Sequence, residues 1–63
     1  MTLTEFKETV KNAISNGTSR KKCMQVLMTD YGVMTLEELD PSCYVDYLKQ
    51  LGINRKGIYE QLN

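Results

Sequence analysis

Histidine and tryptophan are absent from this chain of 63 residues, which also contains only two cysteines and one proline. Without histidine, neither a Ser–His nor a Cys–His nucleophile pair can form. Two cysteines fall short of the ligand set of a structural zinc site, and no glycine-rich phosphate-binding loop is present. We therefore expect a protein that is not an enzyme, with no catalytic residues, no metal and no cofactor.

Long apolar stretches are absent as well. No apolar run approaches the roughly 20 residues of a membrane-spanning helix, and no basic-then-apolar leader opens the chain. These absences predict a soluble cytoplasmic protein that makes no membrane contact. Cys23 and Cys43 lie beside apolar helical positions, so in a reducing compartment we expect small buried side chains, with one disulfide between them as the alternative.

Neither sign of charge is in excess, because eight Lys and Arg residues balance eight Asp and Glu residues. A zero net charge argues against a general polyanion-binding protein. The apolar fraction of 41% and the charged fraction of 25% are typical of a globular chain. A chain this short supports one core with little room for a deep cleft, so residues 1–63 are expected to form a single helical domain.

Helical periodicity is the strongest pattern in the sequence. Thr2 and Glu5 form the pattern of a capping box, and Asn16-Gly17 is typical of a helix end. The first helix is therefore predicted over residues 3–16. Its apolar stripe comprises Leu3, Phe6, Val10, Ala13 and Ile14.

A second helix is predicted between the capping residues Thr18 and Ser19 and the terminating Gly32. Cys23 and Val26 widen its apolar stripe, so we expect this helix to be the most buried of the fold, with methionines filling gaps in the core. The stripe itself comprises Met24, Leu27, Met28 and Tyr31.

A third helical segment follows in two parts. Thr35 and Glu38 form a second capping-box pattern that opens a short turn of helix over LEEL. Asp40-Pro41 then restarts the helix, Gly52 ends it, and the residue after Gly52, Ile53, is expected to pack back. The core positions of this segment are Tyr44, Tyr47, Leu48 and Leu51.

The tail NRKGIYEQLN predicts a short final helix with Asn54 as its cap. No segment alternates apolar and polar residues in the manner of a β-strand. The predicted fold is therefore all-α, a compact bundle of three to five short helices.

The neutral total conceals a separation of charge along the chain. Five acids and no base occur between Cys23 and Leu48, namely Asp30, Glu37, Glu38, Asp40 and Asp46. Two basic clusters flank this stretch, Arg20, Lys21 and Lys22 on one side and Lys49, Arg55 and Lys56 on the other. If the second and third helices are antiparallel, as a short connection favours, the two clusters lie near each other.

The first basic cluster falls in the first turn of the second helix. The helix dipole makes cations there unfavourable by ~0.3–1 kcal/mol each, and core packing gives no reason for them. Backbone amides and cations at one helix start favour the binding of an anionic group. A merely solvated surface is the alternative.

Residues 23–51, CMQVLMTDYGVMTLEELDPSCYVDYLKQL, resemble a small helical module at the carboxyl end of phage single-strand-annealing recombination proteins. The resemblance rests on four features: Tyr31-Gly32-Val33, the turn Thr35–Leu39, Asp40-Pro41, and the pattern of Tyr44, Tyr47 and Leu48. The large annealing domain of that family is missing, so no annealing activity is implied. The resemblance implies a phage-type accessory domain in the host cell that docks onto DNA-processing machinery. In that family such modules contact the acidic, apolar tail of the host single-strand-binding protein.

We therefore expect a non-enzymatic protein that binds an acidic surface or peptide of a host or phage protein in nucleic-acid metabolism or defence. The expected contacts are Arg20, Lys21, Lys22, Lys49, Arg55 and Lys56. Tyr47 and Tyr59 would be aromatic anchors if they were exposed, although their helical spacing favours core packing.

Other functions stay open. The turn NGTS joins two predicted helices, and the second begins with cations, so a helix-turn-helix-like nucleic-acid-binding domain is the alternative. The few exposed basic residues of this domain would give only weak contact with a nucleic-acid backbone. An inhibitor that mimics DNA through the five acids is a further alternative, and exposed methionines and tyrosines would equally suit a homodimer.

Overall fold

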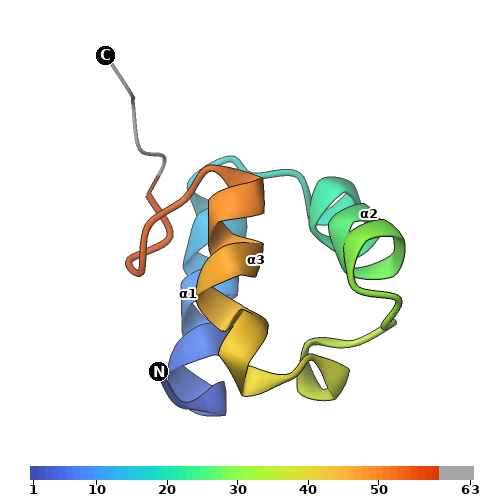
Figure 1. Ribbon diagram of the computed structural model, residues 1–63. Helices are drawn as coiled ribbons and strands as arrows, with labels where there is room; N and C mark the ends of the chain where they lie inside the picture. The colour runs from blue at the N-terminus through green and yellow to red at the C-terminus, as the bar shows by residue number, and fades with distance from the viewer. Residues whose placement is uncertain (59–63) are drawn as a thin grey trace.

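The computed structural model describes residues 1–58, and this part of the chain contains three α-helices. They are α1 (Leu3–Ser15), α2 (Arg20–Asp30) and α3 (Tyr44–Leu51), and two short 3-10 helices, η1 (Leu36–Glu38) and η2 (Pro41–Cys43), lie between α2 and α3. Figure 1 shows α1 and α3 beside each other, α2 to one side, and η1 at the end opposite the α1–α2 connection. No strand occurs within residues 1–58, so the predicted all-α class is confirmed, with a count of three α-helices.

Helix α1 begins at the predicted capping box. The Thr2 hydroxyl accepts a hydrogen bond from the Glu5 amide at 3.1 Å, and the Glu5 carboxylate accepts one from the Thr2 amide at 2.9 Å. The helix ends at Ser15, one residue earlier than predicted, and Gly17 follows with φ +110°. The start and end signals in the sequence thus define this helix correctly.

The core is centred on aromatic contacts between α1 and α3. The Phe6 ring stacks on Tyr44 with a centroid distance of 4.1 Å and meets the edge of Tyr47 at 5.6 Å. Leu48 and Leu51, on the same face of α3 as these tyrosines, are 2% and 1% exposed. All four predicted core positions of α3 are therefore confirmed as buried.

The prediction that the second helix is the most buried is wrong. Only Cys23 and Leu27 of α2 are buried, whereas Met24 and Met28 are 40% and 52% exposed. Cys23 and Leu27 form one set four residues apart, and the methionines form the next set, one residue further along the chain. Because both sets match helical spacing, the periodicity alone could not decide which of them faces α1 and α3.

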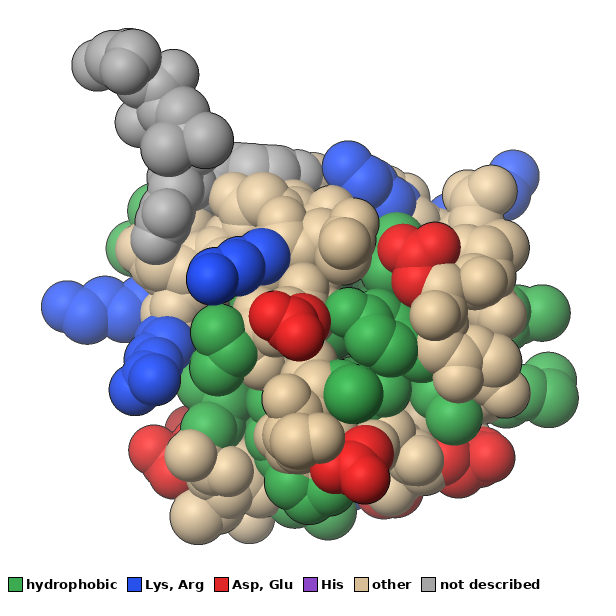
Figure 2. Space-filling view, in the orientation of Figure 1, with side chains coloured by type: hydrophobic (Ala, Val, Ile, Leu, Met, Phe, Trp, Pro, Cys, Tyr) green, Lys and Arg blue, Asp and Glu red, His purple; other side chains and the backbone are tan. Residues whose placement is uncertain are grey.

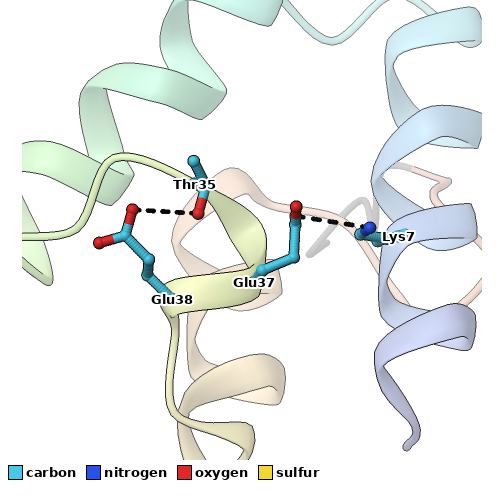
Figure 3. A network of polar contacts seen from close by, with 4 residues as sticks. All are labelled: Lys7, Thr35, Glu37 and Glu38. Atoms are coloured by element: carbon cyan, nitrogen blue, oxygen red, sulfur yellow. Dashed lines mark hydrogen bonds and ion pairs between the residues drawn. The ribbon is translucent and has the colours of Figure 1, made fainter.

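The connection between α2 and α3 departs from the predicted capping. Thr35 forms no capping bond to the backbone; its hydroxyl donates to the Glu38 carboxylate at 3.1 Å instead, and the segment makes a single 3-10 turn (Figure 3). Asp40 does cap the next turn, accepting from the Ser42 amide at 2.9 Å. That turn is also 3-10, so α3 itself begins only at Tyr44.

The end of α3 follows the predicted pattern. Gly52 takes the left-handed conformation with φ +75°, and the Ile53 amide donates to the Leu48 carbonyl at 3.1 Å. Ile53 is 3% exposed, which confirms that this side chain packs back onto the core.

The predicted final helix does not form over residues 54–58, which make a turn instead. The Asn54 side chain accepts from the amides of Lys56 and Ile58, at 2.8 and 3.2 Å, so the predicted cap closes a turn rather than starting a helix. Gly57 lies against α1 with φ +78°, and the Thr9 hydroxyl of α1 donates to the Arg55 carbonyl at 2.7 Å. The rest of the predicted helix, residues 59–63, falls outside the described residues.

Candidate partner-binding surfaces

Four of the six basic residues predicted to bind a partner line two separate hollows of the surface. Lys49, Arg55 and Lys56 come together around an open hollow of about 800 Å³ beside the end of α3. Arg20 lines a different hollow, between α1 and α2, and Lys21 and Lys22 line neither of these two. The structure therefore unites the second basic cluster but gives Arg20 other neighbours than the charge pattern had indicated.

The hollow between α1 and α2, which we call the α1–α2 groove, has a volume of about 520 Å³. Its apolar lining consists of Val10, Ile14, Cys23, Met24, Leu27, Leu36 and Tyr47. Three cations stand around this lining: Lys7, Lys11 and Arg20. An apolar hollow of this size with a few charged groups is typical of a ligand-binding cleft.

Lys7 and Lys11 were absent from the predicted site. They lie one helical turn apart on α1, so both stand on one side of the helix, next to the apolar positions Val10 and Ile14. Glu5 and Glu8 lie in the same helix and balance their charge, so the net charge of this segment does not single them out. The signal that could have found them was this four-residue spacing beside an apolar stripe.

The start of α2 keeps its cations exposed. Ser19 caps the helix as predicted, its hydroxyl accepting from the Lys22 amide at 3.2 Å. The first turn contains Arg20, Lys21 and Lys22 and no acid. The unfavourable interaction of these cations with the helix dipole is therefore not offset within the turn. Arg20 is the member of this cluster that also lines the α1–α2 groove.

Lys49 has a structural reason for its position that Arg20 lacks. It lies in the last turn of α3, where the helix dipole favours a cation. Arg55 and Lys56 sit on the neighbouring turn, which Asn54 closes with its side chain. This surface therefore presents three cations on a firmly held backbone.

Figure 2 shows how charge is distributed over one face of the molecule. Lys and Arg side chains lie toward the upper and left parts of this face, and Asp and Glu side chains mostly across its middle and lower parts. Apolar side chains are visible between them. Charges of both signs thus occur on this face, with basic side chains more frequent above and acidic ones more frequent below.

Tyr47, which would serve as an aromatic anchor only if it were exposed, is completely buried, as its helical spacing favoured. Its hydroxyl donates to the Cys23 carbonyl of α2 at 2.8 Å, and its ring contacts Phe6 and Tyr31. Burial raises the pKa of the Tyr47 hydroxyl far above its ordinary value, so it remains a hydrogen-bond donor at physiological pH. The second predicted anchor, Tyr59, lies outside the described residues.

The cysteines are both free, and no disulfide joins them. Cys23 is 4% exposed, and burial raises the pKa of its thiol. Cys43 is half-buried. Within residues 1–58, no three His, Cys, Asp or Glu side chains gather as a metal would require, and no helix there has the length and apolar character to cross a membrane.

Comparison with known proteins gives no match to this chain among family models, curated proteins or solved structures.

Proposed function

We propose that this protein is a non-enzymatic binding module whose α1–α2 groove takes a segment of a partner protein that carries both acidic and apolar side chains. The observation that carries the proposal is the apolar lining of the groove with Lys7, Lys11 and Arg20 around it. Val10 and Leu27 in its floor are 4% and 1% exposed, whereas Met24 on its α2 side is 40% exposed. The groove therefore offers a firm floor and one accessible apolar wall.

The apolar lining and the cations of the groove would recognise different side chains of the partner. Apolar side chains of the partner would be removed from water against Met24 and Leu36, at roughly 25 cal/mol per Å². Acidic side chains would meet the cations, which favours fast association and selects against basic partners. Met24 is unbranched and flexible, so it can adjust to partners of different shape.

The biological setting that we propose is a phage-type accessory protein that acts on a host or phage protein in nucleic-acid metabolism or defence. This part rests on the resemblance of residues 23–51 to the module of single-strand-annealing recombination proteins. An acidic, apolar tail such as that of a host single-strand-binding protein has the chemistry that the groove fits.

A nucleic-acid-binding domain of helix-turn-helix type is the second candidate. The observation in its favour is the first turn of α2, which carries three exposed cations and no acid. Its phosphate contacts would make binding strongly dependent on salt. The apolar lining of the α1–α2 groove has no role in that function, which is why we place it second.

Calorimetric titration separates the two candidates. The probe is a short synthetic peptide with Asp residues at one end followed by Leu and Ala residues, and the parallel probe is a single- or double-stranded oligonucleotide. We expect the peptide to bind the wild-type protein, and the double variant Lys7→Glu with Lys11→Glu to weaken binding by about tenfold or more.

The matched control reverses two charges on the other hollow, Lys49→Glu with Lys56→Glu, and should leave peptide affinity unchanged. An equal loss of peptide affinity in both double variants would show that net charge alone causes the effect. That result would contradict the proposed site. Oligonucleotide binding that weakens steeply with salt, in the absence of peptide binding, would support the second candidate instead.

A further inference from the structure

An ion pair spans one end of the α1–α2 groove. The Lys7 ammonium of α1 lies 3.5 Å from a Glu37 carboxylate oxygen of η1, and both side chains are about half exposed. Figure 3 shows Glu37 reaching across from η1 toward Lys7. Lys7 lines the groove, as does Leu36, the chain neighbour of Glu37, so the pair lies at the η1 end of the groove.

The two adjacent glutamates of η1 have different positions. Figure 3 shows the Glu38 carboxylate turned away from α1, where it accepts a hydrogen bond from the Thr35 hydroxyl at 3.1 Å. Glu37 makes no bond within its own turn and faces α1. The 3-10 turn therefore directs a single carboxylate at the groove.

The other end of the groove, toward the α1–α2 connection, carries cations that are not ion-paired within residues 1–58. Lys11 lies one turn beyond Lys7 on α1, and Arg20 lies where the chain from α1 enters α2. Within residues 1–58, neither of these cations takes part in an ion pair. One cation of the groove is thus ion-paired at the η1 end, and two form no ion pair within residues 1–58 toward the α1–α2 connection.

We infer that Glu37 sets the orientation of the bound segment. This inference rests on the proposed function. The acidic residues of the segment lie at the Lys11 and Arg20 end, and its uncharged apolar residues lie over Leu36 at the η1 end. A carboxylate placed at the η1 end would have to compete with Glu37 for Lys7 and would be repelled by it. The partner is therefore a segment with its acids gathered at one end.

Paramagnetic broadening in NMR spectra tests the orientation. The probe is the same acidic–apolar peptide, carrying a nitroxide at its acidic end in one sample and at its apolar end in another. We expect the acidic-end label to broaden amide signals of residues 15–21, and the apolar-end label to broaden those of residues 36–38. The reverse assignment, or equal broadening at both ends from either label, overturns the inference but leaves the groove as the binding site.

Substitution of Glu37 gives an independent readout. A second peptide carries Asp residues at both ends, and Glu37→Gln should raise its affinity by about two- to fivefold, the range of an exposed ion pair. Glu38→Gln is the matched control on the same turn and should leave that affinity unchanged. An equal rise in both variants, or no rise in either, overturns the inference. Failure of both peptides to bind any form of the protein overturns the proposed function and this inference with it.

Discussion

The Tyr47 hydroxyl donates a hydrogen bond to the Cys23 backbone carbonyl at 2.8 Å, and this is a direct polar link between α3 and α2. Both residues are buried, so water does not compete for the bond. Cys23 lines the α1–α2 groove, and the bond therefore holds one wall of the groove against the core.

Removal of this hydroxyl in Tyr47→Phe should lower the free energy of unfolding by about 1 kcal/mol, since the Cys23 carbonyl loses a buried donor. Urea unfolding monitored by circular dichroism measures the change. Tyr31→Phe is the control. Tyr31 contacts the Tyr47 ring in an edge arrangement, and Tyr31 is only half-buried. Equal losses in the two variants would show that the hydrogen bond contributes nothing specific.

Stability should fall at alkaline pH because of the same two residues. Burial raises the pKa of both the Cys23 thiol and the Tyr47 hydroxyl in the folded protein, so the unfolded chain loses these protons first. The free energy of unfolding should decline above pH ~8.5, where an unfolded thiol ionises, and more steeply above pH ~10, where an unfolded tyrosine ionises. Urea titrations across this range test the sign. Cys23→Ala should remove the first part of the decline, and an unchanged profile would contradict the account.

The two buried threonines should respond in opposite directions to replacement by valine. Thr18 is 3% exposed, and its hydroxyl makes no hydrogen bond within the described residues. Thr18→Val should therefore raise the free energy of unfolding by about 1 kcal/mol. Thr9→Val should lower it, because the Thr9 hydroxyl donates to the Arg55 carbonyl. Thermal unfolding of both variants measures the two changes. A lower stability of Thr18→Val than of the wild-type protein would contradict the view that the Thr18 hydroxyl is buried without a hydrogen bond.

Gly57 has no room for a side chain. A Cβ atom there would lie 2.6 Å from the Thr9 carbonyl oxygen and 2.7 Å from the Ala13 amide nitrogen, and its φ is +78°. Gly57→Ala should lower the free energy of unfolding by more than the ~1 kcal/mol typical of a non-glycine residue in the left-handed conformation. It should also displace the turn from α1. Gly32→Ala is the control, since Gly32 has a similar φ of +67° and open space around it. Equal costs in thermal unfolding would show that the contact with α1 is unimportant.

Much of the fold was predictable because its signals are local. The Thr2–Glu5 capping box, the Ser19 and Asp40 caps and the left-handed Gly52 each depend on residues a few positions apart. The prediction of a helix over residues 54–58 was wrong because Gly57 packs against α1, a contact with residues far away in the sequence. Local propensity at Asn54 cannot distinguish a helix cap from a turn cap.

The candidate site was harder to predict than the helices. Arg20 was proposed from its conflict with the helix dipole, whereas its neighbours Lys7 and Lys11 depend on how α1 lies beside α2. Tyr47 was considered as an anchor, if exposed, because aromatic residues are common in interfaces, but its helical spacing with Tyr44 and Leu48 already favoured the core, where the structure places it. Helical spacing was therefore the better guide to this residue.

The measurement that tests the central claim most directly is NMR mapping of the acidic–apolar peptide on the protein. During the titration, we predict amide shift changes that are concentrated on Lys7–Ser15 of α1 and Arg20–Leu27 of α2, the walls of the α1–α2 groove. Shift changes concentrated on Lys49–Lys56, with the groove signals unmoved, would contradict the claim.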